Sequence, residues 1–162
     1  METKQLAVLF FPLTFLILIP LVLIYNFQEG NFIFSFYDPF IFIGILLVIA
    51  GSVILATSVM ALHQAGEGAI APWDASAKLV TSGLYAYTRN PMISGAILIL
   101  LGEAAIFGSL PILVWAVTFF ILNSLYFNYY EEPTLEKKFG EEYREYKKNV
   151  SAWRPRRKPW KK

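Results

Sequence analysis

Long runs without a charged residue constrain this chain more than any other feature. Twenty-four uncharged residues separate Lys4 from Glu29, and another twenty-four separate Asp38 from His63. Two further apolar runs follow a polar connection. A helix needs about 20 mainly apolar residues to cross a bilayer. We therefore predict an all-α, polytopic integral membrane protein with about four transmembrane helices, at residues 5–25, 39–62, 92–107 and 111–130.

The first run has an alternative interpretation as a cleaved signal peptide. The apolar core of a signal peptide spans about 7–15 residues and ends in small residues. This run is longer and ends in Tyr25-Asn26-Phe27, which favours a retained span. Pro12 and Pro20 fall inside it, but neighbouring groups in a membrane protein can satisfy the carbonyls that a proline leaves free.

Composition excludes several kinds of site. The chain is 56% hydrophobic and only 16% charged, whereas an ordinary soluble domain carries about 25% charge. It has no cysteine, which excludes a disulfide framework and a thiolate nucleophile. One histidine, His63, is too few for a histidine-built metal site, so we expect no metal. The length of 162 residues predicts a single domain.

The distribution of cations predicts the orientation. Eleven of the fourteen Lys and Arg residues lie between positions 137 and 162. Cations near helix ends stay in the cytoplasm, so the C-terminus is predicted to be cytoplasmic. Four spans return the N-terminus and the connection 63–91 to the same side. That connection carries Lys78 and Arg89, whereas the connection 26–38 carries no cation.

Two polar segments are therefore predicted on one membrane face. The connection 63–91 mixes glycine, proline and aromatic residues, which is typical of an ordered loop along the membrane surface. The second segment begins at residue 131 and includes an amphipathic helix to about Val150, which Gly140 weakens slightly. Beyond it lies a basic tail that we expect to contact anionic head groups. The alternative is a solvated tail.

Several polar residues are candidates for function, and each has a structural alternative. Glu131 and Glu132 would form a dense negative site, or cap a helix and pair with Lys137 or Lys138. Arg89 could bind an anion or anchor a helix among head groups. His63 could serve as a base or cap its helix. Glu103, inside the third span, is expected to hydrogen-bond to the helix 111–130.

Three blocks of sequence together resemble the isoprenylcysteine carboxyl methyltransferase and phospholipid methyltransferase superfamily. The resemblance is close to bacterial members of unassigned substrate and covers roughly residues 63–156. The blocks follow one another at the superfamily's spacing: Lys78-Leu79-Val80-Thr81-Ser82-Gly83-Leu84-Tyr85-Ala86-Tyr87-Thr88-Arg89-Asn90-Pro91-Met92, then Leu101-Gly102-Glu103-Ala104, then Tyr130-Glu131-Glu132-Pro133-Thr134-Leu135 followed by Phe139-Gly140-Glu141-Glu142-Tyr143 and Tyr146.

The resemblance implies a membrane enzyme that uses S-adenosyl-L-methionine to methylate a lipophilic or membrane-associated small acceptor at the cytoplasmic face. It implies membrane lipids as partners and no nucleic acid. Gly66 and Gly68 correspond loosely to a Gly-x-Gly of phospholipid methyltransferases. The catalytic candidates are Glu132, Arg89 and His63. The positions that match cofactor positions are Lys78, Leu79, Val80, Tyr85, Asn90, Pro91, Met92 and Glu131.

The chain departs from the prenylcysteine enzymes at two places. Asn90 stands where those enzymes have histidine, and Phe127 lies in the stretch before the Glu pair where they carry an arginine suited to a carboxylate. Methyl esterification of a prenylated cysteine is therefore not favoured, although Arg89 could substitute. The alternatives are a non-catalytic membrane lipid-binding or scaffold protein that retains the fold, and a small transporter. Binding of S-adenosylmethionine would discriminate between them.

Overall fold

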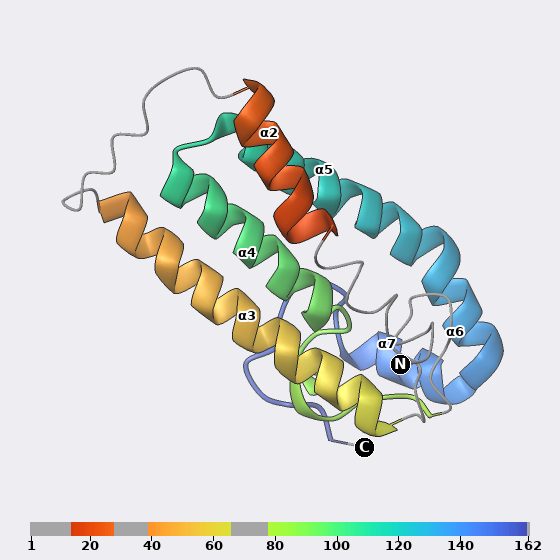
Figure 1. The fold of residues 1–162 in the computed structure, drawn as a ribbon. Coiled ribbons are helices and arrows are strands. Elements are labelled where there is room, and N and C mark those ends of the chain that lie inside the picture. The colour runs from red at the N-terminus through yellow and green to blue at the C-terminus, as the bar shows by residue number, and fades with distance from the viewer. Residues whose placement is uncertain (1–13, 28–38, 66–77, 162) are drawn as a thin grey trace.

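The regular structure of the described chain is entirely helical (Figure 1). The structure is a computed structural model that describes residues 14–27, 39–65 and 78–161. Among these residues there is no strand. The elements in chain order are η1 (Thr14–Leu18), α2 (Ile19–Phe27), α3 (Pro39–Ala65), η2 (Gly83–Ala86), α4 (Pro91–Phe107), α5 (Leu110–Tyr126), η3 (Phe127–Glu131), α6 (Glu132–Phe139) and α7 (Glu141–Asn149).

A tight hairpin joins α4 to α5, as the sequence predicts. Helix α4 ends at Gly108, which adopts a left-handed conformation with φ of 55° that favours glycine. The next residue, Ser109, caps α5, because its hydroxyl accepts a hydrogen bond of 3.5 Å from the Ile112 amide. Two residues are therefore enough to reverse the chain, and α4 and α5 pack against each other.

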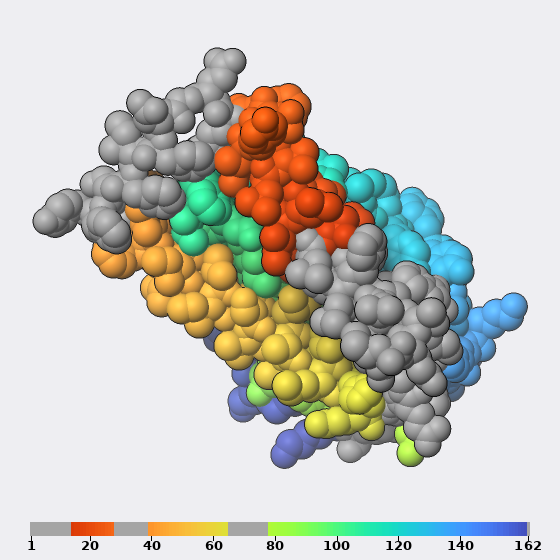
Figure 2. All heavy atoms as spheres, viewed as in Figure 1, coloured from red at the N-terminus to blue at the C-terminus, as the bar shows by residue number. Residues whose placement is uncertain are grey.

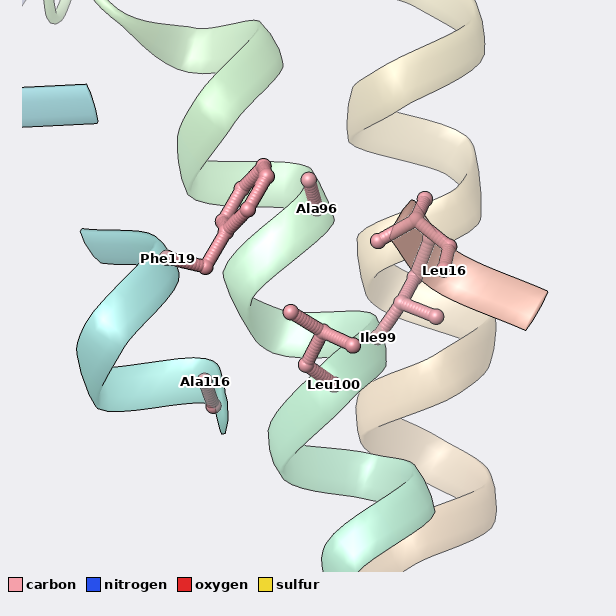
Figure 3. Packing of buried hydrophobic residues seen from close by; sticks show 6 residues of the cluster. All are labelled: Leu16, Ala96, Ile99, Leu100, Ala116 and Phe119. Atoms are coloured by element: carbon pink, nitrogen blue, oxygen red, sulfur yellow. The ribbon is translucent and has the colours of Figure 1, made fainter. Parts of the chain in front are cut away.

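Helix α4 lies at the centre of the bundle, between α3 and α5 (Figure 1). Its small and aliphatic residues face both α5 and the N-terminal segment. Figure 3 shows this cluster, which consists of Leu16, Ala96, Ile99, Leu100, Ala116 and Phe119. The Trp115 indole also donates a hydrogen bond of 3.1 Å to the Phe15 carbonyl, which fastens η1 to α5.

Two reciprocal glycine pairs bring the backbones of α3 and α4 into direct contact. Gly44 faces Gly102, and Gly51 faces Gly95. A Cβ atom added at any of the four would lie 2.6–2.8 Å from the carbonyl oxygen of its partner. Small residues allow close helix approach, which matters in lipid because the hydrophobic effect does not drive helices together there. The sequence of either helix alone does not reveal this interface.

Within the described residues, two helices are long and apolar enough to cross a membrane, namely Pro39–Gln64 and the continuous helix Leu110–Phe139. Only 11% of the most apolar stretch of the first and 22% of that of the second is buried. A core helix of a soluble protein would be mostly buried, so these exposed apolar faces favour contact with lipid. In Figure 2, α2 and α3 form much of one face, with no other coloured element over them.

The described helices lie close to the ranges predicted as spans, with one correction. The ranges 39–62 and 92–107 match α3 and α4, and the described part of 5–25 is helical from residue 14. The other two apolar helices, Thr14–Phe27 and Pro91–Phe107, are shorter, so the count of four spans stays a prediction. The helix expected at 111–130 instead continues to Phe139 through the wider turns of η3.

The predicted single amphipathic helix from 131 to about Val150 is wrong in one respect. Gly140 does more than weaken it, because it adopts a φ of 56° and separates α6 from α7. A residue with a side chain would be strained in that conformation. The break turns α7 back so that its aromatic face can pack on residues near position 85.

The glycine contacts predict a specific loss of stability. In Gly51→Leu, the new side chain would meet the Gly95 carbonyl and force α3 away from α4. We expect the free energy of unfolding in mixed micelles to fall by about 2 kcal/mol, as for other overpacked sites. The control is Ala50→Leu, on the exposed side of α3, which should change it little. Equal stability of the two variants would contradict this interface.

Candidate functional site

One end of the bundle gathers the polar segments that the sequence analysis singles out. The carboxyl end of α3, the amino end of α4 and the carboxyl end of α5 all lie there (Figure 1). The segment 78–90, helices α6 and α7, and the C-terminal residues 150–161 occupy the same end. The structure therefore confirms that the two polar stretches, far apart in sequence, meet in space.

Backbone hydrogen bonds tie the C-terminal residues to the segment before α4. The amides of Arg89 and Asn90 donate to the carbonyls of Ser151 and Ala152, at 3.0 and 3.2 Å. Two amides from the C-terminal side donate in return. Their bonds are Arg156 N to Tyr87 O at 3.0 Å and Trp160 N to Ala86 O at 2.9 Å. These bonds hold the backbone of residues 86–90 against the C-terminal residues.

An aromatic cluster supports the same segment from the side of α7. Tyr146 donates a hydrogen bond of 2.6 Å to the Tyr85 carbonyl, and both phenols are buried. The buried members of the cluster are Tyr143, Tyr146 and Val150, with Leu79, Leu135, Phe139 and Trp160 packed against them. The predicted cofactor residues Leu79 and Tyr85 are thus positioned by α7.

A buried ion pair joins the start of α4 to the extension of α5. Arg89 donates through Nη1 to Glu132 Oε1 and, at 3.0 Å, to the Tyr143 hydroxyl. The side chains of Arg89 and Glu132 are only 9% and 10% exposed. The second Glu132 oxygen lies 2.7 Å from Lys147 Nζ. Both oxygens of this carboxylate are therefore neutralised by cations.

These contacts correct two expectations from the sequence. Glu132 pairs with Arg89 and Lys147, not with Lys137 or Lys138. Arg89 does not extend to head groups, since its side chain is buried and its guanidinium lies 5.4 Å from the centre of the Phe127 ring. The Arg89 guanidinium therefore packs on Phe127, which lies in the stretch where the resemblance leads us to expect an arginine in prenylcysteine enzymes. Its Nη1 atom, however, is bound to Glu132.

Glu131 differs from Glu132 in that it has no hydrogen-bond or ion-pair partner among the described residues. Its side chain is half-buried. Burial raises the pKa of the Tyr85 phenol, and the negative charge of Glu131 raises it further, as does Tyr146. The carboxylate of Glu131 is therefore close enough to Tyr85 to affect the pKa of its phenol. Burial and the negative charge of Glu132 raise the pKa of the Glu131 carboxyl to about 7, and no described cation pairs with it.

The Tyr143 hydroxyl lies beside the ion pair, 3.0 Å from Arg89 Nη1. Burial raises the pKa of its phenol to about 12, while the positive charge of Arg89 opposes that shift and the charge of Glu132 adds to it. The hydroxyl stays protonated at neutral pH. It accepts from Arg89 Nη1 and keeps its own proton available for donation.

Asn90 contributes a buried donor that the described residues leave unused. Its amide nitrogen Nδ2 has no hydrogen-bond partner among them, although the residue is only 7% exposed. The backbone carbonyl of Asn90 accepts from both the amide and the hydroxyl of Ser94, but its side chain does not cap α4. A buried donor without an acceptor destabilises a protein, so this nitrogen is suited to a ligand.

The other site residues predicted from the sequence differ in how far they are buried. Val80 and Pro91 are buried, Met92 is half-buried, and Lys78 and His63 are exposed. Gly66 and Gly68 lie outside the described residues. Glu103 lies toward the opposite end of α4, and its Oε2 has no hydrogen-bond partner among the described residues, so the predicted bond to α5 is not found at that oxygen.

Comparison with known proteins identifies the family. The fold and the site define a helical protein with exposed apolar faces and a polar centre at one end of its bundle. The family model described as phospholipid methyltransferase matches residues 39–142, more than half of the chain. The chain belongs to this family, which confirms the resemblance to the superfamily. No curated protein and no solved structure matches it.

The buried ion pair predicts unequal effects of two arginine substitutions. Arg89→Met would leave the Glu132 carboxylate buried with only Lys147, and we expect it to lower the free energy of unfolding by about 3 kcal/mol. Arg144→Met removes an exposed pair with Glu141 and should cost about 0.5 kcal/mol or less. Both are measured by circular dichroism during denaturation in mixed micelles. Similar losses in the two variants would reject the structural role of Arg89.

Proposed function

We propose that this protein transfers a methyl group from S-adenosyl-L-methionine to a lipophilic or membrane-associated acceptor at the cytoplasmic membrane face. The family is a methyltransferase family, which supports methyl transfer to a lipid-related substrate. The choice of cofactor, the membrane face and the residues that act are the proposal. The end of the bundle that holds Glu131 and Asn90 is the proposed site.

The observation that carries the proposal is the difference between two adjacent carboxylates. Glu132 is neutralised by Arg89 and Lys147, whereas Glu131 has no cationic partner among the described residues. S-adenosylmethionine carries a sulfonium and an ammonium group. An uncompensated carboxylate in a half-buried position attracts such a cation more strongly than one in bulk water. Glu131 is therefore the proposed anchor for the positive charge.

Other groups at this end fit the rest of the cofactor. Asn90 Nδ2 is a donor without a partner and could bind a carboxylate or hydroxyl oxygen. Tyr85 contributes an aromatic ring close enough to Glu131 for the two groups to interact electrostatically. Aromatic rings attract sulfonium and ammonium groups. The backbone of residues 86–90 is held by hydrogen bonds on the C-terminal residues, so these groups are preorganised.

The proposed reaction needs little acid–base chemistry from the protein. When bound, the cofactor supplies an electrophilic methyl group for direct displacement. The protein then contributes mainly by holding the reacting groups in line, which can account for a large part of the rate. This agrees with a chain whose one histidine, His63, is exposed at the end of α3. We accordingly assign no general base.

The acceptor is proposed to be lipid-like and not a carboxylate. A carboxylate acceptor would have to compete with Glu132 for the Nη1 atom of Arg89, and residues 126–130 contain no cation. A phospholipid amine needs no such arginine. The exposed apolar faces of α3 and α5 allow a lipophilic molecule to approach laterally from the bilayer. A hydroxyl on a lipophilic ring or a thiol is compatible with the same arrangement.

The charge argument predicts the effect of Glu131→Gln. The variant keeps the shape of the side chain and loses its charge, so affinity for S-adenosylmethionine should fall at least about tenfold, as expected for a charge-assisted contact. Calorimetry in detergent measures the dissociation constant. The matched control is Glu145→Gln, an exposed residue of α7. Unchanged affinity in Glu131→Gln would remove the proposed anchor.

Failure of the wild-type protein to bind the cofactor would instead support the non-catalytic lipid-binding or scaffold alternative. The acceptor itself is sought by mass spectrometry of membrane extracts. Under the proposal, one lipid species gains the mass of a methyl group in place of a hydrogen, and only when both protein and cofactor are present.

Asn90→Ala should lower the affinity for the cofactor without lowering the thermal midpoint of the free protein. Because the side chain of Asn90 makes no capping bond and its Nδ2 is buried without a partner, removing it should leave the thermal midpoint of the free protein unchanged or raised. Cofactor affinity should nevertheless fall about threefold to tenfold through loss of one hydrogen bond. A purely structural role for Asn90 would lower the midpoint and leave the affinity unaffected.

A further inference from the structure

We propose that residues 151–161, here called the basic tail, form a docking surface for anionic lipid head groups, and that docking stabilises the backbone hydrogen bonds that hold residues 86–90. The basic tail lies outside the residues that the family model matches. The docking surface stands independently of the methyl-transfer proposal, whereas its consequence for cofactor binding rests on that proposal.

The contacts of Trp153 place the start of the basic tail against a candidate membrane span. Its ring lies 5.1 Å from the ring of Phe120 and 6.1 Å from that of Phe127, measured between centres. Phe120 is an exposed residue of α5 and lies more than one turn before its end at Tyr126. Tryptophan favours the boundary between hydrocarbon and head groups. The residues next to Trp153 therefore lie at head-group depth.

Four of the cations that follow Trp153 are exposed and have no ion-pair partner among the described residues. They are Arg154, Arg157, Lys158 and Lys161. Each Lys or Arg near an anionic bilayer surface strengthens the binding of a protein to that surface about fivefold. None of these four cations pairs with Glu132, which instead binds Arg89 and Lys147. An anionic lipid surface is the partner that this charge fits.

The same residues are joined to the proposed site through the backbone. The bonds to Ser151 O and Ala152 O come before the exposed cations, and the bonds from Arg156 N and Trp160 N lie among them. Trp160 also packs on Tyr146, at 5.6 Å between ring centres. A bilayer that holds the basic tail in place therefore also holds residues 86–90 and, with them, the unpaired amide of Asn90.

Hydrogen exchange in nanodiscs tests the docking without any cofactor. The protein is placed in phosphatidylcholine discs with or without about one third phosphatidylglycerol. We expect the paired amides to exchange about tenfold more slowly in the anionic discs, because several cations engage the surface. These amides belong to Arg89, Asn90, Arg156 and Trp160. High salt should abolish the difference in the wild-type protein.

A charge-matched pair of variants makes the test specific. Arg154→Gln with Arg157→Gln changes exposed side chains and should remove the difference between the two lipids. Lys137→Gln with Lys148→Gln loses the same charge elsewhere and should retain it. Equal exchange of the wild-type protein in both lipids overturns the proposal, as does loss of the effect in both variants. Since no cofactor is added, these outcomes are independent of whether the protein binds S-adenosylmethionine.

Discussion

The buried contact between Arg89 and Glu132 connects the parts of this protein that meet at the polar end of the bundle. Arg89 stands immediately before α4, and Glu132 stands where the long helix from α5 continues into α6. Lys147 and Tyr143 bring α7 to the same carboxylate and guanidinium. Removing two charges from water is unfavourable, and close pairing with additional hydrogen bonds must offset that cost. Here both oxygens of Glu132 have partners.

This contact also separates the roles of two adjacent residues. Because the cations are bound to Glu132, the neighbouring Glu131 has no cationic partner among the described residues. A helix turns by about 100° per residue, which follows from 3.6 residues per turn. The two carboxylates therefore point in different directions, and that of Glu132 binds Arg89. One glutamate holds the end of the bundle together, and the other can attract a positively charged ligand.

Much of the architecture could be predicted from the sequence because it depends on local patterns. Apolar runs gave the helices, Gly108 and Ser109 gave the hairpin, and the positions of the two polar stretches predicted that they would meet. The charge partners of Glu132 could not be predicted, since Arg89 is 43 residues away in the chain and only the fold brings it near. The nearby Lys137 was the reasonable local alternative.

Other features were missed for different physical reasons. Gly44 faces Gly102, and Gly51 faces Gly95, only because α3 and α4 pack in one particular register. The sequence of a single helix does not reveal that register. The break at Gly140 depends on whether glycine adopts a positive φ, and the sequence permits either outcome. The pairing of residues 151–160 with 86–90 needs no particular side chains, because backbone groups make the bonds.

The central claim is that the end of the bundle bearing Glu131 binds the methyl donor. Ultraviolet crosslinking of radiolabelled S-adenosylmethionine to the protein in nanodiscs, followed by peptide mapping, tests it most directly. The account predicts saturable labelling within residues 78–92 or 126–132, which excess S-adenosylhomocysteine suppresses. Labelling confined to the hairpin around Gly108, or labelling that no competitor suppresses, would contradict it.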